Sequence, residues 1–307
     1  MLIRNFIFWL STKKKLTDAI GRRGMKYGFA KRFVSGETLE EAVAACQALN
    51  QQGRQISLNH LGENVHTEAE AVRVKDGYLA MVRELISRKI DGNISIKLTQ
   101  LGLDISKNFC QQLADEIAGT AKSLGQTIEI DMEASPYTDA TLDIYESARR
   151  RSDNVALAVQ AYLHRTSKDL ERLAPLKPKI RLVKGAYREP KNVAYQKKSD
   201  VDTNYCRLID QLLDGPYFPA IATHDPRMLD YARAALRKRG LAPDRYEFQM
   251  ICGVRRDLQQ QLRDQGHPLR IYVPFGTEWC PYFMRRLSER PANCWFVVKN
   301  LVAESFR

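Results

Sequence analysis

The sequence predicts an α/β fold in which eight parallel strands, each followed by a helix, close a barrel. Helical and strand-like periodicity alternate from residue 37 onward, and the starts of the expected strands lie 23 to 40 residues apart. This spacing leaves room for the crossover helix that a parallel strand pair requires. No linker rich in proline, glycine or serine divides the chain of 307 residues, and its 44% hydrophobic and 27% charged residues are typical of a globular protein.

The N-terminal region, residues 1–50, is expected to be a helical arm, and residues 51–307 the barrel domain. Residues 2–10 are mostly apolar with one positive charge, Arg4, and three lysines follow at positions 13–15. This stretch lacks the longer apolar region and the small residues at a cleavage site that a secretory signal needs. A helix packed on the barrel and an aromatic, basic arm on a membrane surface both remain open for it.

The strands are expected at regular intervals, with amphipathic segments between them. Their expected ranges are 55–61, 92–98, 127–134, 155–163, 180–187, 220–224, 246–253 and 269–276. A doubly wound open sheet is the competing architecture. Eight βα units are the number that closes a (β/α)8 barrel of the TIM type, so the count favours closure.

Carboxylates alternate with apolar residues in the third expected strand. Glu129, Asp131 and Glu133 take every second position there. Helices cover the outer face of a barrel strand, and that face must be apolar. We therefore expect the three carboxylates inside the barrel.

The same rule identifies the cations that would pair with these carboxylates. It sends Ser95, Lys97 and Thr99 to the interior and puts Arg181 and Tyr187 on the face opposite Lys184. Unpaired charges inside a barrel are costly, so Lys97, Arg181 and the acidic strand are expected to neutralise one another. A purely structural ion-pair network is the alternative, because such networks also perturb pKa values.

Polar residues gather at the C-terminal ends of the expected strands, where barrel enzymes keep their active sites. These residues are Lys97, Asp131, Tyr187, Thr223 and His224. A single histidine is more often a core or helix-capping residue than a catalytic one. The position of His224 directly after an expected strand favours a place in the site.

A last helix is expected after the eighth strand, between Pro281 and Pro291. Side chains that are three or four residues apart share one stripe of it. These are Tyr282, Arg285 or Arg286, and Glu289. Two adjacent guanidinium groups beside a barrel mouth suit a carboxylate or phosphate ligand, although an exposed face with ordinary ion pairs has the same charge pattern.

Composition and motifs exclude several classes of protein. Six scattered cysteines without a C-x-x-C pair argue against a disulfide scaffold and indicate reduced thiols in an intracellular protein, and the five histidines form no zinc motif. Glycine-rich phosphate loops of the dinucleotide and P-loop types are missing. The net charge of +12 is compatible with a nucleic-acid-binding protein, but clusters such as 149–151 and 237–239 look like solvated helix ends, so no nucleic-acid partner is expected.

Five motifs together resemble the monofunctional bacterial proline dehydrogenases. They occur in that family's order and spread over about residues 37 to 300. The motifs are S-I-K-L-T-Q-L-G at 95–102, I-D-M-E at 130–133, R-L-V-K-G-A-Y at 181–187, A-T-H-D at 222–225 and Y-F-M-R-R-L-S-E-R at 282–290. The resemblance implies a distorted (β/α)8 barrel that binds FAD at the C-terminal ends of its strands. It also implies oxidation of L-proline to 1-pyrroline-5-carboxylate.

The resemblance also implies roles for individual residues. Arg285 and Arg286 would pair with the proline carboxylate. Lys97 would add a cationic contact, and Glu289 would orient the two arginines. The side chains that would enclose the proline ring are Tyr187, Tyr272 and Tyr282.

Two further residues would act at the reactive centre. Asp131 would hold the aromatic and cationic wall in place, and Arg181 would lie close to the reactive part of the flavin and stabilise negative charge on the reduced ring. The positions that match FAD-binding residues are Met132, Gln160, Lys184, Gly185, Ala186, Thr223 and His224. No metal is implied.

The family further implies partners and a location. Electrons would pass to a membrane quinone, and a separate dehydrogenase would take the pyrroline-5-carboxylate. The protein would be cytoplasmic, with peripheral contact to the inner face of the membrane through its N-terminal arm. A barrel aldolase with Lys97 or Lys184 as a Schiff-base nucleophile is the rival enzyme class, but it does not account for the arginine helix.

Overall fold

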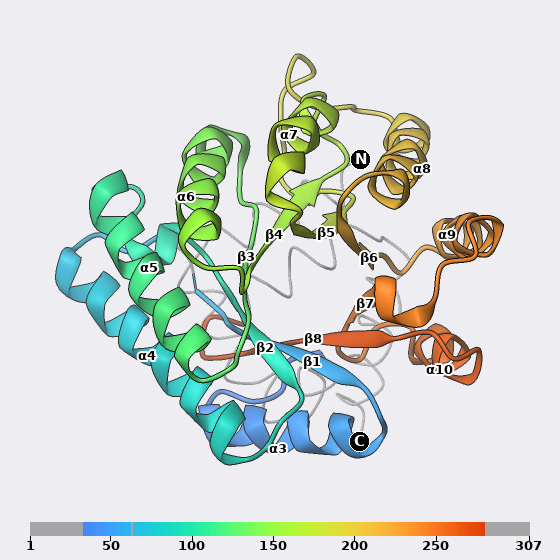
Figure 1. The fold of residues 1–307 in the computed structure, drawn as a ribbon. Helices are drawn as coiled ribbons and strands as arrows, with labels where there is room; N and C mark the ends of the chain where they lie inside the picture. Colours follow the sequence, from blue (N-terminus) through green and yellow to red (C-terminus); the bar gives the residue numbers. More distant parts are fainter. Residues whose placement is uncertain (1–32, 63, 280–307) are drawn as a thin grey trace, which may run out of the picture.

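Eight parallel strands form a closed barrel in the computed structural model, which describes residues 33–62 and 64–279 (Figure 1). Each strand pairs with the next in the sequence, and pairing of β1 with β8 closes the barrel. The expected closed topology is therefore confirmed. The strands are β1 (Gln55–His60), β2 (Gly92–Ile96), β3 (Ile128–Ile130), β4 (Val155–Gln160), β5 (Lys179–Val183), β6 (Phe218–Ala222), β7 (Glu247–Ile251) and β8 (Leu269–Phe275).

The helices surround the barrel as an outer layer (Figure 1). The α-helices of the described chain are α3 (Leu39–Gln51), α4 (Glu68–Ser87), α5 (Lys107–Ser123), α6 (Thr138–Arg151), α7 (Thr166–Leu173), α8 (Lys198–Asp214), α9 (Pro226–Lys238) and α10 (Arg256–Asp264). Short 3₁₀ turns are η2 (Thr99–Leu101), η3 (Ser135–Tyr137), η4 (Ala174–Leu176) and η5 (Pro243–Arg245). Helix α3, which begins within the expected arm of residues 1–50 and ends at Gln51, packs against β1 and β8 as part of this layer.

Local sequence signals explain where two of these helices begin. Thr38 and Thr67 are the N-caps of α3 and α4, and each accepts a hydrogen bond from the backbone of the third helical residue. That residue, Glu41 or Glu70, accepts one in return from the N-cap backbone. This reciprocal arrangement satisfies backbone N–H groups that have no partner inside a helix, so it defines the first turn.

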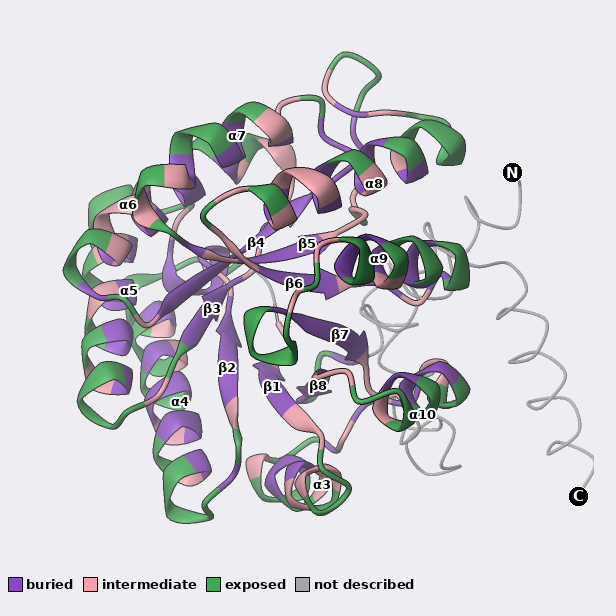
Figure 2. Ribbon diagram, turned by 45° about the vertical axis from the view of Figure 1, so that its right-hand side comes forward, coloured by how far each residue is buried: buried purple, intermediate pink, exposed green. Residues whose placement is uncertain are grey.

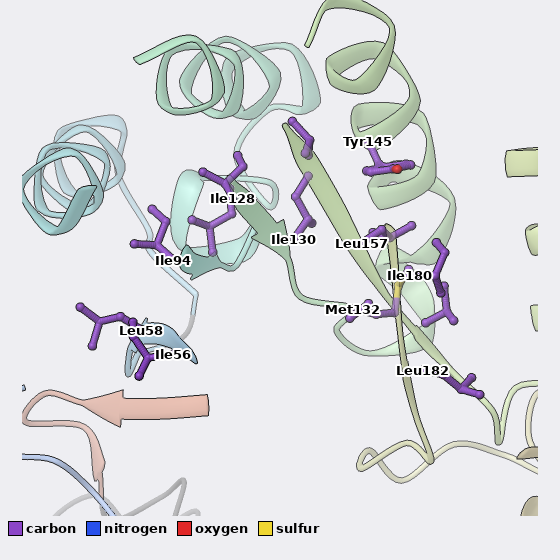
Figure 3. Close-up of a cluster of buried hydrophobic side chains, with 14 of the residues drawn as sticks. Ile56, Leu58, Ile94, Ile128, Ile130, Met132, Tyr145, Leu157, Ile180 and Leu182 are labelled. Carbon is purple, nitrogen blue, oxygen red and sulfur yellow. The ribbon is translucent and has the colours of Figure 1, made fainter. Parts of the chain in front are cut away.

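The apolar core lies between the barrel strands and the helices. Figure 2 shows the strands largely buried, and the helices buried mainly on the side that faces the strands and exposed on the other. Figure 3 shows outward-facing side chains of the strands, among them Ile94, Ile130 and Leu157, packed toward the helices. All three are less than 2% exposed. Burial of one such side chain contributes about 1.5–3 kcal/mol, which makes this layer the main source of stability.

The strands are shorter than the periodicity indicates at their C-terminal ends. β3 was expected to reach residue 134 but ends at Ile130, although the N–H of Asp131 still donates to the carbonyl of Ile96. Beyond it the chain turns into η3, which contains Pro136. Alternation of side chains thus continues past the last paired residue, because an extended backbone does not require a neighbouring strand.

Candidate active site

The acidic strand directs its carboxylates into the barrel, as the alternation predicts. Ile128 and Ile130 face the helices, and Glu129 between them is fully buried inside the barrel. Glu133 lies after the end of β3 and is also buried, where its carboxylate accepts hydrogen bonds from the N–H and hydroxyl of Thr99 at 3.0 and 2.6 Å. Burial raises the pKa of Glu133 above its usual value, and the two bonds from Thr99 oppose that shift.

Asp131 is the meeting point of the residues at the barrel mouth. Its carboxylate accepts hydrogen bonds from Lys97 Nζ at 3.2 Å, from Arg181 Nη1 at 2.6 Å and from the Tyr272 hydroxyl at 3.0 Å. A fourth bond comes from the Ser95 hydroxyl. Burial alone would raise the pKa of Asp131, but Lys97 and Arg181 outweigh it and hold the pKa below its usual value. The carboxylate therefore stays ionised and joins two cations and an aromatic ring.

Arg181 projects into the barrel from β5, and its guanidinium group is almost completely enclosed. All five of its N–H donors face acceptors of this chain: Nε faces Gln249 at 2.7 Å, Nη1 faces Asp131 and Ser95, and Nη2 faces Glu129 and Ser57. The centre of the guanidinium also lies 5.1 Å from the ring centroid of Tyr272. Its two carboxylate partners are the ones that the strand pattern predicts, so the expected neutralisation is confirmed.

Lys97 follows β2 and reaches the same mouth. Its ammonium donates to Asp131 and, at 3.4 Å, to the side-chain oxygen of Asn59. Two of its three N–H donors thus have acceptors in the described chain. The backbone N–H of Lys97 donates to the buried hydroxyl of Tyr78 at 3.2 Å, which holds the residue in place after the strand ends.

The predicted cofactor residues all lie at the C-terminal ends of four neighbouring strands or directly after them. Met132 follows β3, Gln160 is the last residue of β4, Lys184, Gly185 and Ala186 follow β5, and Thr223 and His224 follow β6. Tyr187 lies in the same loop after β5 and is partly exposed. The structure therefore brings these residues to one edge of the barrel, beside the cluster around Asp131.

Two features of this edge are suited to a polar ligand. The side-chain oxygen of Gln160 is buried and has no hydrogen-bond partner among the described residues, while its amide nitrogen donates to the carbonyl of Met132 at 3.1 Å. Gly185 has a positive φ of 111°, and a Cβ added there would lie 2.1 Å from the ring of Tyr162. A buried acceptor that lacks a donor is uncommon in a folded protein, because its burial without a hydrogen bond costs free energy. A ligand that donates to the oxygen of Gln160 would remove this cost.

Lys184 is held by two carboxylates that sequence reasoning did not identify. Its ammonium donates to Asp225 at 2.8 Å and to Asp202, and both acids also contact Lys198. Burial would raise the pKa of Asp225, but the two lysines outweigh it and lower that pKa. Since Lys97 and Lys184 are both engaged in ion pairs, neither is placed as the isolated amine that an aldolase nucleophile requires.

The ring of His224 accepts a hydrogen bond from the neighbouring strand. The backbone N–H of Ile251, the last residue of β7, donates to Nε2 of His224 at 2.8 Å. Thr223 accepts a hydrogen bond from the backbone N–H of Asp225 at 3.1 Å. The first bond ties the loop after β6 to the end of β7, and the second lies within that loop.

Four predicted substrate residues lie outside the described part of the chain. They are Tyr282, Arg285, Arg286 and Glu289. Their roles stay predictions. Within residues 33–62 and 64–279, no group of three or more potential ligands could hold a metal ion, and no helix has the length and apolar character to cross a membrane.

Comparisons with known proteins identify the family. A sequence model of the family described as proline dehydrogenase matches residues 42–299. Proline dehydrogenase 2 of Bacillus subtilis is 37% identical over 98% of this chain and 99% of its own length. Proline dehydrogenase of Deinococcus radiodurans is 37% identical over 93% of each chain.

The bifunctional relatives match over a smaller part of their length. Bifunctional protein PutA of Escherichia coli is 30% identical over 89% of this chain but only 24% of its own length. Among solved structures, PutA of Bdellovibrio bacteriovorus inactivated by N-propargylglycine has the same fold, with a TM-score of 0.80 and 24% identity over 85% of this chain and 32% of its own. The family expected from the five motifs is thus confirmed, and the chain belongs to the proline dehydrogenase family.

Proposed function

We propose that the protein oxidises L-proline to 1-pyrroline-5-carboxylate with FAD bound at the C-terminal ends of the barrel strands. The observation that carries this proposal is the single carboxylate of Asp131, which joins Lys97, Arg181 and Tyr272 at the barrel mouth. This arrangement supplies cations for an anionic substrate and an aromatic surface for its ring. Family membership supports the same reaction, since relatives that match this chain over nearly their whole length are named proline dehydrogenases.

The residues at the barrel edge fit a flavin. Gln160 offers a buried oxygen that lacks a donor, and the loop at Gly185 brings its backbone close to the ring of Tyr162, with no space for a side chain. Lys184, held by its two carboxylates, would present its charge beside that loop. The remaining members of the edge, Met132, Ala186, Thr223 and His224, would line the same site. Bound FAD would supply the acceptor for a hydride from proline C5 at its N5.

The substrate would be held at its carboxylate. We propose that Arg285 and Arg286 form the anchor, that Glu289 orients them and that Lys97 adds its remaining N–H donor. Bidentate pairing with arginine sets both the position and the direction of a carboxylate.

Aromatic side chains would restrict the proline ring. Tyr272 is held by its hydroxyl bond to Asp131 and by its contact with the guanidinium of Arg181. Tyr187 and Tyr282 would close other sides of the pocket. A ring that is covered on several sides and anchored at one end loses its freedom to rotate, which lowers the barrier to reaction.

Arg181 would act through its charge. Because each of its N–H donors already faces an acceptor of this chain, its contribution to a reduced flavin would be the field of a buried cation. Asp131 would keep that cation at its place and would hold Lys97 and Tyr272 with it. Neither residue needs to form a covalent bond with the substrate.

The proposal extends to the fate of the electrons and the product. By analogy with the family, a membrane quinone would accept the electrons, and a separate dehydrogenase would oxidise the pyrroline-5-carboxylate. The protein would work in the cytoplasm, with the aromatic and basic residues 2–15 in contact with the inner face of the membrane.

An absorbance spectrum of the purified protein tests cofactor and substrate together. We expect flavin bands that bleach when L-proline is added without oxygen. Cyclopentanecarboxylate is the matched control, because it has the ring and the carboxylate but no amine, and it should leave the flavin oxidised. Protein that binds no flavin, or flavin that L-proline leaves oxidised, would contradict the proposal.

A further inference from the structure

A second layer of buried charges lies below the cluster around Asp131, toward the N-terminal ends of the strands. Glu247 of β7 is 3% exposed, accepts a hydrogen bond from Arg270 of β8 at 3.0 Å and forms an ion pair with Lys179 of β5 at 2.9 Å. Burial would raise the pKa of Glu247, but Arg270 and Lys179 outweigh it and lower the pKa to about 2. Glu247 is therefore an ionised carboxylate that is enclosed by two cations.

The amide of Gln249 bridges the two layers. Its oxygen accepts from Nε of Arg181 at 2.7 Å, and its nitrogen donates to Oε1 of Glu247 at 2.6 Å. Gln249 is 2% exposed and lies on β7, two residues after Glu247, so both side chains point into the barrel. Only one orientation of the amide is possible, because a guanidinium can only donate and a carboxylate can only accept.

We propose that Gln249 is a positioning residue that sets the orientation of the Arg181 guanidinium at the reactive centre. This inference rests on the proposed function. Gln249 takes the Nε–H, so the plane of the guanidinium is defined and its two Nη groups are directed at Asp131 and Glu129. Gln249 is a neutral partner of Arg181, as Ser57 and Ser95 are, and it is itself anchored to the layer below by its hydrogen bond to Glu247.

The effect would reach the substrate side through Asp131. A guanidinium without its Nε partner can turn about its last bonds, and it then no longer presents Nη1 to Asp131 in the same geometry. Asp131 also holds Lys97 and Tyr272, so the positions of these two side chains would change when the carboxylate of Asp131 moves.

The substitution Gln249→Met tests this role, because methionine has similar length and no hydrogen-bonding amide. Removal of one hydrogen bond to a charged group corresponds to roughly a tenfold change or more, and we expect kcat with L-proline to fall by that factor. We expect KM to change less than kcat, because the substitution removes none of the residues proposed to bind the substrate. The midpoint potential of the bound flavin should also fall, since a less well placed cation stabilises the reduced anion less.

The substitution Gln249→Glu gives a second test through its pH dependence. The new carboxyl group would face Arg181 and also Oε1 of Glu247, with Glu129, Lys179 and Arg270 as the other charged groups around the two layers. Two carboxylates in direct contact cannot both be ionised, so the new group is expected to keep its proton. While protonated it donates to Glu247 and accepts from Arg181, as the glutamine does.

The direction of the pH effect follows from this arrangement. A carboxyl group whose pKa is raised in the folded state does not reduce stability at a pH below its unfolded pKa. It destabilises the protein as pH rises through its folded pKa, because the buried group then loses its proton. The kcat of Gln249→Glu relative to the unsubstituted protein should therefore be near one at low pH and decrease with rising pH. The Gln249→Met variant should show no recovery at low pH. The glutamate variant also covers the case in which the methionine variant does not fold.

Gln211→Met is the matched control. Gln211 lies on α8 and is half-buried, and its amide contacts only Ser167 of α7 among the described residues: its oxygen accepts from the Ser167 hydroxyl at 2.8 Å and its nitrogen donates to the Ser167 carbonyl at 3.0 Å. We expect this control to lose stability and to keep kcat and flavin potential. Equal losses of kcat and potential in both variants, or an unchanged kcat and potential in Gln249→Met, would overturn the inference.

A readout without flavin or activity separates this inference from the proposed function. In protein labelled with ¹⁵N-arginine, the Nε–H of Arg181 should give a resonance protected from exchange, and Gln249→Met should remove that protection. Retained protection in the variant would overturn the positioning role. A protein without flavin would overturn the proposed function, while this resonance would still report on the contact between Gln249 and Arg181.

Discussion

Replacement of Asp131 by asparagine should destabilise the folded protein by about 3 kcal/mol at neutral pH. Two of the four hydrogen bonds to this carboxylate come from cations, Arg181 at 2.6 Å and Lys97 at 3.2 Å. Hydrogen bonds to charged groups contribute about 1.5–3 kcal/mol each, and loss of one partner of a buried ion pair costs about 3–5 kcal/mol. Asparagine keeps the size of the side chain, so the loss reports on charge and not on a cavity.

The pH dependence of this loss gives an independent check. The pKa of Asp131 is lowered in the folded protein, so its stabilising contribution is present above the unfolded pKa and is lost as pH falls through the folded pKa. The unfolded pKa of an aspartate is about 3.9. Asparagine does not titrate, and the difference between the two proteins should therefore decrease from pH 7 to pH 3.

Urea unfolding followed by circular dichroism at pH 7 and pH 3 measures both quantities. Asp257→Asn is the matched control, because Asp257 is 62% exposed and pairs only with its neighbour Arg255 in the described chain. We expect this control to lose less than about 1 kcal/mol. An Asp131→Asn variant that matches the control, or that loses the same free energy at both pH values, would refute the reasoning.

Three further predictions concern ligand and membrane binding. Gly185→Ala should lower the flavin content of the purified protein, measured as the ratio of flavin to protein absorbance, because its positive φ and the aromatic ring beside it leave no space for a Cβ. Arg285→Ala and Arg286→Ala should each raise the KM for L-proline by roughly 100-fold in steady-state kinetics, and unchanged kinetics in both would remove their proposed role. Deletion of residues 1–15 should reduce liposome binding and quinone reduction, and unaltered values would exclude membrane contact through this segment.

The strand pattern was sufficient to predict the barrel and the paired charges at its mouth. Alternation along the third strand placed Glu129 and Asp131 inside, and the structure has both against Arg181. The rule works because one face of each strand must be apolar to pack on a helix. It gives the direction of a side chain but not its partner on another strand.

The charge layer below the mouth was missed, although a signal for it exists. Glu247 and Gln249 alternate with apolar residues in β7, and Arg270 does the same in β8. These positions resemble no ligand-binding motif, so nothing singled them out. Of the two carboxylates that hold Lys184, Asp225 lies in the A-T-H-D motif after β6, but nothing in the sequence shows that it meets the lysine. Asp202 has no signal, because it lies on a helix 18 residues away and meets the lysine only through the fold.

Closure of the barrel joins segments that are far apart in the sequence. Gln55 of β1 pairs with Arg270 of β8, so the contacts between β1 and β8 cannot form until almost the whole barrel has been synthesised. Until then, β1 and β7 are open edges with unpaired N–H and carbonyl groups, which can associate with other chains. A nascent chain that stops before Leu269 would thus keep two aggregation-prone edges, and chaperone contact during translation should be longest for this protein just before β8 leaves the ribosome.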